Sequence, residues 1–378
     1  MLAAILSAGV GSSGRAANSS LEERVAILEG HVVQLSSENQ ALRARLAGGS
    51  DRPSSAGVLP EGRAAKISLG GLMQVQGESS GAPDSRYTGL SERFQLRRMR
   101  VALAGMFAEG IAFKFETDFG NASISGRSGA AGQITDATVT WTRYAACNLR
   151  AGQFKTPFGY EQLVSDPKTT FVERSLANDR STIGRQIGIQ ASGDIVKSVL
   201  GYAAGVFNGS GTNNGANDNS KFMSVGRLVA TIYTGTAGGQ PVRWTAAANS
   251  FNTVDKGGFT GRRTGYGVDS QLNWGPAQVG AEWLRNDNHP VTGLPLATAG
   301  WYAFGAWNFD RSWQGAVRFD VYDSALHRRA TTTREWTLGL NHFLKGDDLK
   351  LMLNYQLGNP PAPLPRAGRW LGRMQVVF

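Results

Sequence analysis

The stretch YGVDSQLNWGPAQVGAEW, residues 266–283, alternates apolar and polar residues on both sides of a short turn. Before Gly275 the apolar positions include Tyr266 and Trp274, and after it they include Val279 and Trp283. Successive side chains of a β-strand point to opposite faces. The stretch therefore predicts two antiparallel strands, each with one apolar and one polar face, joined by a tight turn at Gly275.

The same pattern recurs from Lys66 to Phe378 in about 16 segments, most of them near the roughly 9 to 11 residues that cross a bilayer obliquely. A soluble sandwich would turn the apolar faces inward and a membrane barrel would turn them outward, so periodicity is compatible with both. No run of about 18 apolar residues follows the extreme N-terminus, which excludes a helical span there. The even number of segments favours an all-β, antiparallel transmembrane β-barrel.

The connections between these segments tend to alternate in length, as they do in porins. Tight ones are expected at Ala108, 145–146, Gly275, Arg311 and 345–346, and long ones at 156–182, 208–219 and 287–298. Tight turns would be periplasmic and long loops extracellular. The chain ends at Phe378 in an alternating segment, so its last residues are expected to form the final strand.

The charge of the chain points to an anionic partner. Its 378 residues carry a formal net charge of +10, and the acidic and basic residues of 1–60 cancel, so the whole excess lies beyond them. The arginines are dispersed over alternating segments without a nucleic-acid-binding motif, which argues against nucleic acid. Small anions and the lipopolysaccharide of an outer membrane are the expected partners.

The N-terminal region follows a different pattern. Residues 1–17 look like a truncated secretory signal, and heptads within 18–47 place Leu at d and Val25, Val32 and Asn39 at a, which predicts a short α-helical coiled coil in the periplasm. A single amphipathic helix is the alternative. Residues 48–65 read as a linker, and 66–378 as the barrel. The heptads leave a dimer and a trimer open, and a cell-wall contact through the coiled coil is conceivable.

Several basic residues fall on the phase that would line the lumen of such a barrel. Alternation places Arg98 and Arg100 inward and Arg97 outward, and it also places Lys114 and Arg318 inward. Guanidinium and ammonium groups bind phosphate well, and permeation requires several weak sites. These residues are therefore candidates for guiding anions, although ordinary lumen walls also carry charges without selectivity.

The longest connection, 156–182, contains Arg174 and Arg180, and Arg185 follows it. A loop of this length in a compact domain is usually functional. Folded into the lumen, it would narrow the pore and place Arg174 or Arg180 at the constriction. An ordinary extracellular lid is the alternative.

Six segments resemble the phosphate-selective porin O and P family: RRMRVALAG (97–105), KFETDF (114–119), GQFKTPFGY (152–160), TTFVERSL (169–176), YAAGVFNGSG (202–211) and TLGLNHFL (337–344). The resemblance covers roughly residues 64–378. It implies a 16-stranded trimeric barrel whose third loop folds inward, with arginines and lysines guiding anions.

We therefore expect a porin in the outer membrane of a Gram-negative bacterium, through which small anions, phosphate or polyphosphate first, diffuse passively. A general non-selective porin and a structural tether that uses the coiled coil are the alternatives. The chain has no nucleophile elbow and no Walker loop, so an enzyme is not expected. A lone Cys147 and four scattered His lack metal-ligand spacing, and no cofactor is expected.

Overall fold

The computed structural model describes residues 66–81, 92–108, 110–120, 132–256, 260–361 and 366–378. The predicted signal segment (1–17), coiled coil (18–47) and linker (48–65) lie outside these residues. Among the described residues, no helix is both long and apolar enough to span a membrane.

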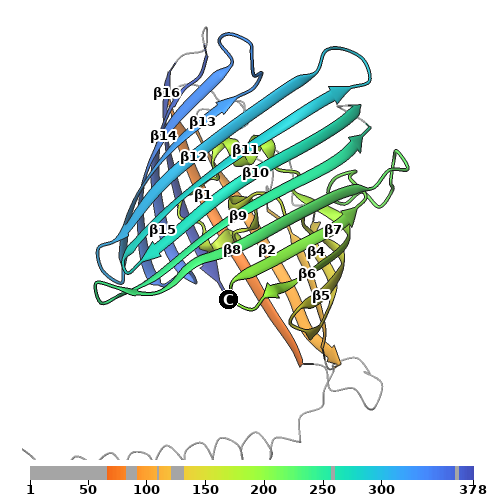
Figure 1. Ribbon diagram of the computed structural model, residues 1–378. Coiled ribbons are helices and arrows are strands. Elements are labelled where there is room, and N and C mark those ends of the chain that lie inside the picture. Colours follow the sequence, from red (N-terminus) through yellow and green to blue (C-terminus); the bar gives the residue numbers. More distant parts are fainter. Residues whose placement is uncertain (1–65, 82–91, 109, 121–131, 257–259, 362–365) are drawn as a thin grey trace, which may run out of the picture. The chain divides into compact units, whose positions relative to one another are not determined.

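The described chain forms one closed antiparallel barrel of sixteen strands, which confirms the predicted fold class (Figure 1). Each strand pairs with its neighbours in the sequence, and the first pairs with the last. The strands are β1 (Lys66–Ser80), β2 (Glu92–Ala108), β3 (Ile111–Asp118), β4 (Gln133–Tyr144), β5 (Cys147–Lys155), β6 (Arg185–Val196), β7 (Leu200–Phe207), β8 (Met223–Ala237), β9 (Gln240–Asp255), β10 (Gly261–Trp274), β11 (Ala277–Pro290), β12 (Leu296–Asn308), β13 (Trp313–Asp323), β14 (Thr332–Lys345), β15 (Leu349–Asn359) and β16 (Ala367–Val377).

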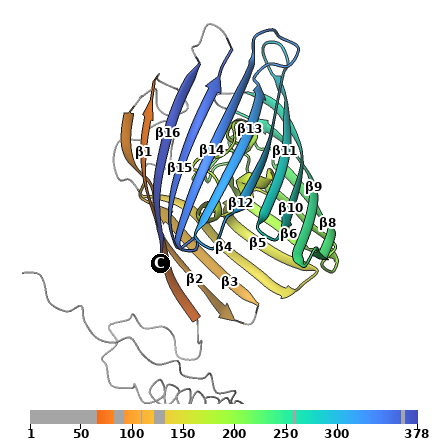
Figure 2. The ribbon, with the colours of Figure 1, turned by 90° about the vertical axis from the view of Figure 1, so that its left-hand side faces the viewer.

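The last residues of the chain close the barrel. Figure 2 shows β16 lying beside β1, with a register that runs from Leu72 opposite Val377 to Ser80 opposite Arg369. Beyond β16, the Gly71 N–H donates to the Phe378 carbonyl at 2.8 Å, and the Phe378 N–H donates back at 3.2 Å. Closure leaves no strand edge unpaired, which a sheet surrounded by lipid requires.

The outward faces of the strands are apolar and carry two rows of aromatic residues. One row lies next to the tight turns and includes Trp244, Trp274 and Trp307, and the other includes Tyr266 and Trp283. Eight residues separate Trp274 from Tyr266 on β10, which corresponds to roughly 20 Å along the axis of a barrel with tilted strands. Aromatic rows at this spacing mark the two borders of a lipid-facing band.

Some predicted connections differ from the observed ones. The expected long loop 287–298 shrinks to 291–295, because β11 continues to Pro290 and β12 begins at Leu296. The turn between β6 and β7, for which no position was predicted, lies at 197–199. It forms there because Ser198 adopts a positive φ of 62° and its N–H donates to the Asp194 carboxylate at 3.3 Å.

The connection between β5 and β6, residues 156–184, folds into the barrel, and we call it the inner loop (Figure 1). It contains the short helices α2 (Tyr160–Leu163), η2 (Asp166–Lys168) and α3 (Leu176–Ser181). Helix α3 packs against β11, β12 and β13. The predicted inward fold of residues 156–182 is thus observed, and the extracellular lid is not.

Gly152 on β5 offers a test of the strand pairing that leads into the inner loop. Its φ is +122°, and an added Cβ would lie 2.0 Å from the Ala137 carbonyl oxygen. We expect Gly152→Ala to destabilise the barrel by about 1–3 kcal/mol or more, because a strained φ combines with a backbone clash. Gly226→Ala is the control, since nothing lies within 4 Å of its Cβ position. Equal urea midpoints for the two variants in detergent would contradict this account.

Candidate functional site

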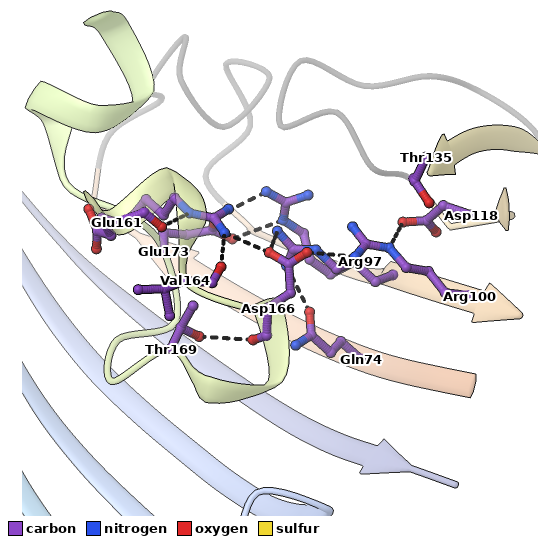
Figure 3. Close-up of polar contacts among 12 residues, drawn as sticks. Gln74, Arg97, Arg100, Asp118, Thr135, Glu161, Val164, Asp166, Thr169 and Glu173 are labelled. Atoms are coloured by element: carbon purple, nitrogen blue, oxygen red, sulfur yellow. Dashed lines mark hydrogen bonds and ion pairs between the residues drawn. The ribbon is translucent and has the colours of Figure 1, made fainter. Parts of the chain in front are cut away.

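Asp166 of the inner loop lies at the centre of a group of arginines (Figure 3). Its carboxylate is 2.6 Å from Arg100 Nη1, 2.8 Å from Arg174 Nη2 and 3.2 Å from Arg98 Nη2, and the residue is 3% exposed. Burial by itself would raise the pKa of Asp166, but the three guanidinium groups hold it well below its ordinary value. The carboxylate is therefore charged and ties the loop to β2.

Glu173 forms a second attachment of the loop, at the β1–β16 seam. It accepts two hydrogen bonds from Arg97, at 3.0 and 3.1 Å, and one from Arg373 of β16 at 2.9 Å. Gln76 of β1 donates to the same carboxylate at 3.0 Å. Burial would raise the pKa of Glu173, and the two arginines lower it far below its usual range.

The prediction that Arg97 faces outward is wrong. Gln74 lies opposite Arg98 and Val75 lies opposite Leu96, so Arg97 is an extra residue in β2 without a partner on β1. Such a bulge interrupts the alternation and lets neighbouring residues point to the same face. Arg97 and Arg98 therefore both face the interior, and both are buried.

Arg318 of β13 holds the middle of the inner loop. It faces the interior, as its phase predicts, and its guanidinium group donates to Asp320 at 2.8 Å and to the Glu173 carbonyl at 3.0 Å. It lies 4.6 Å from the centre of the Phe171 ring. Arg318 is 1% exposed. It therefore contacts the inner loop directly, and it affects the pore only through the position of that loop.

The start of α2 is attached to the opposite wall through Glu282 of β11. The backbone N–H groups of Tyr160 and Glu161 donate to its carboxylate at 2.5 and 3.3 Å, and the Tyr302 hydroxyl donates at 3.0 Å. Apolar contacts add to this attachment. Phe158 packs with Phe207, Phe251 and Leu284, Phe171 packs with Tyr302, and Val172 packs with Met352. The inner loop is therefore held on several sides of the barrel.

A cavity of about 380 Å³ lies beside the loop, between it and strands β1–β6 with the end of β16. Its charged lining consists of Arg100, Lys114, Glu116, Asp136, Lys155, Asp166 and Arg185. Lys114 is 2.7 Å from Asp136 and 2.9 Å from Glu116, and Arg185 is 2.8 Å from Asp136. Two of the predicted site residues, Lys114 and Arg185, thus meet at one pair of carboxylates.

Lys155, at the end of β5, was not predicted. It lines this cavity and also a second one of about 310 Å³, which Arg150, Gln190 and Arg227 border. Its ammonium group donates to the Val164 carbonyl at 3.0 Å. Within the described part of the chain, no carboxylate oxygen comes within 4.0 Å of it. Its place in the GQFKTPFGY segment, directly before the loop, was the signal available in the sequence.

The two arginines predicted for the constriction have different surroundings. Arg174 is half-buried, and besides Asp166 it donates to the carbonyls of Glu161 and Val164, at 2.9 and 3.2 Å, so it supports the loop from within. Arg180 is exposed near the end of α3. The role of either in lining the pore stays a prediction.

In the described ranges, no three His, Cys, Asp or Glu side chains form a group that would hold a metal ion.

Comparisons with known proteins agree with this architecture. The family model of the phosphate-selective porins O and P matches residues 77–359. No curated protein sequence matches the chain.

Similar solved structures share the fold at low sequence identity. The outer membrane channel DcaP of Acinetobacter baumannii has a TM-score of 0.62 at 14% identity and covers 86% of this chain and 99% of its own. An anion-selective porin from Comamonas acidovorans has a TM-score of 0.59 at 12% identity, with coverages of 83% and 100%. The trimer form of OmpT of Vibrio cholerae has a TM-score of 0.56 at 9% identity, with coverages of 83% and 100%.

Replacing Asp166 tests whether the ion pairs hold the inner loop. Asp166→Asn keeps the shape of the side chain but removes the negative charge that three guanidinium groups contact, and breaking buried pairs costs about 3–5 kcal/mol. We expect amide hydrogen exchange within residues 160–181 to accelerate. Asp218→Asn makes the same charge change at an exposed hydrogen bond to Ser210 and should leave that exchange unchanged. Equal protection in both variants would rule out the proposed attachment.

The pKa directions of Asp166 and Glu173 predict resistance of the loop to acid. Both pKa values are lowered in the folded state. The two carboxylates therefore stabilise the folded loop fully above their unfolded-state pKa of about 4. This stabilisation is lost only as the pH falls through their lower, folded-state pKa values. Exchange protection of the loop, corrected for intrinsic rates, should therefore persist at pH 4. Loss of protection between pH 6 and 4 would contradict the assignment of these two carboxylates.

Proposed function

The chain belongs to the phosphate-selective porin O and P family, and on that premise we propose that it is an outer-membrane porin through which small anions diffuse passively. The matched region extends over most of the barrel, including the inner loop. We place the protein in the outer membrane of a Gram-negative bacterium, with the tight turns in the periplasm and the longer connections outside.

The observation that carries the anion preference is the position of Lys155 between two cavities beside the inner loop. The amine of Lys155 donates to one carbonyl and forms no ion pair within the described residues, so its remaining hydrogen-bonding capacity is open to a passing solute. Arg150 borders the second cavity, and Arg185 and Lys114 border the first. A row of cationic groups on one wall would raise the local concentration of anions.

In this proposal the basic residues divide into two groups. Arg97, Arg98, Arg100 and Arg318 are buried and paired with carboxylates, so they chiefly position the loop. Lys155 and Arg150 border open space without an ion pair among the described residues, and Arg185 borders it while paired with Asp136. An anion would enter along the positive potential, exchange part of its hydration for hydrogen bonds to these groups, and leave, because each site is weak.

Phosphate is the anion we favour, because a compact oxyanion accepts hydrogen bonds from ammonium and guanidinium groups at once.

The second candidate is a general porin without a phosphate site. It is favoured by the carboxylates that share the first cavity, Glu116, Asp136 and Asp166, which offset much of the basic charge. The tether hypothesis depends on residues 18–47, which the structure does not describe.

We also propose a homotrimer. The trimer form of the similar OmpT of Vibrio cholerae supports this assembly. The family and the fold are those of channels, and the proposal includes no enzymatic activity or cofactor.

Substitution of Lys155 tests the proposal. We expect Lys155→Met to lower the permeability ratio of chloride over potassium about two- to threefold, because it removes a cation from both cavities. The measurement is the reversal potential of the purified porin in a planar bilayer under a KCl gradient. Lys345→Met is the charge-matched control, since the Lys345 side chain is 79% exposed in a tight turn.

The same bilayers distinguish phosphate selectivity from general conduction. In a phosphate-binding channel, phosphate at low concentration reduces the chloride current of the wild type, and Lys155→Met weakens this block. Equal selectivity in Lys155→Met and Lys345→Met would reject Lys155 as a determinant. Absence of block in the wild type would leave the general porin.

A further inference from the structure

Aromatic side chains form a continuous cluster on the outward face of β12, β13 and β14. The rings of Trp301 and Phe319 are 5.6 Å apart and meet edge to face, and those of Phe319 and Trp336 are 4.5 Å apart. All three side chains belong to the outward phase, and they lie in the row of aromatics farther from the tight turns. This row marks the outer border of the apolar band.

Arginines lie immediately beyond this cluster, on the side away from the tight turns. Arg334 is on the same face of β14 as Trp336, two residues farther out, and it lies opposite Val321. Arg328 and Arg329 belong to the connection between β13 and β14. All three are exposed. In the part of the chain that the structure describes, no carboxylate oxygen lies within 4.0 Å of their guanidinium groups.

The acidic residue Asp323 accepts its hydrogen bonds from within its own turn. Asp323, at the end of β13, accepts hydrogen bonds from the Ala325 N–H at 3.0 Å and from the Thr331 hydroxyl at 2.7 Å. The Leu326 N–H donates to the Ala297 carbonyl at 2.8 Å, which holds this connection against β12. The connection that carries Arg328 and Arg329 is thus fixed to the neighbouring strand at this end of the barrel.

Basic charge at this position matches the phosphates of a lipid headgroup. The outward-facing positions at the outer ends of β1, β8 and β9 hold Ser79, Ser224 and Asn252. Arg262 of β10 and Arg285 of β11 also face outward at this end of the barrel, and Arg285 is paired with Asp287 at 2.8 Å. Guanidinium groups bind phosphate in a bidentate manner, and basic residues at the border of a bilayer gain about 1 kcal/mol each from anionic lipids. The aromatic cluster below would contact the acyl chains and the sugar.

We propose that Arg328, Arg329 and Arg334, above the Trp301–Phe319–Trp336 cluster, bind the phosphate groups of a phosphorylated glycolipid of the outer leaflet, the lipid A part of lipopolysaccharide. This site rests on the proposed location in the outer membrane. It lies on the outside of the barrel and is separate from the cavities beside the inner loop.

The test uses the full chain refolded in detergent, with purified lipid A, dephosphorylated lipid A and inorganic phosphate as probes. For the wild type, lipid A should bind with a measurable Kd and raise the Tm, and the other two probes should do neither at the same concentration. In the R328Q/R329Q/R334Q variant we expect the Kd for lipid A to rise about tenfold or more, because three charge-assisted contacts are lost. Added salt should weaken wild-type binding.

A triple variant at the opposite end, R143Q/R311Q/K345Q, makes the same change in charge and is the control. It should bind lipid A as the wild type does. Equal affinity in both triple variants would overturn the site, and so would a wild-type response to inorganic phosphate equal to that to lipid A.

Planar bilayers of neutral phospholipid separate this inference from the proposed function. The R328Q/R329Q/R334Q variant should keep wild-type conductance and anion selectivity there, since none of its three residues lines the cavities beside the inner loop. Conductance without lipid A binding would refute the lipid site and leave the porin. Lipid A binding without conductance would refute the porin and leave the site.

Discussion

The arrangement inside the barrel depends on buried carboxylates that are matched to buried arginines. Asp166 and Glu173 lie on a loop that has little regular structure of its own, and the arginines around them project from β2, β13 and β16. A charge buried without a partner costs several kcal/mol, so neither set is stable inside the barrel without the other. The loop therefore determines where the arginines point, and the arginines determine where the loop lies.

The fold could be predicted from the sequence because alternation in a strand is a local property. The segment 266–283 shows both strands and their turn, and Lys114 and Arg318 lie on the predicted face. Arg97 could not be placed in this way, because a bulge depends on the register with β1. The partners of Asp166 and Glu173 are also distant in the sequence, at separations of 66 residues for Arg100 and 76 for Arg97. Only the assembled barrel brings these groups together.

The candidate site was predicted less well than the fold for a related reason. A count of basic residues on the lumen phase does not distinguish an arginine that holds a loop from one that faces a solute. The difference lies in the partners: Arg98 and Arg100 meet a carboxylate of the loop, whereas Lys155 meets only a carbonyl group. Charge that remains after internal pairing, and not total charge, is the relevant quantity for permeation.

The attachment of Glu173 also has a consequence for biogenesis. One of its guanidinium partners, Arg97, is in the second strand, and the other, Arg373, is in the last. Arg97 lies 76 residues before Glu173 and Arg373 lies 200 residues after it, so Glu173 gains both guanidinium partners only when β16 joins β1. The inner loop can enter the barrel before closure, but its attachment through Glu173 is complete only after β16 has paired with β1. The final structure of the channel interior therefore depends on closure of the barrel.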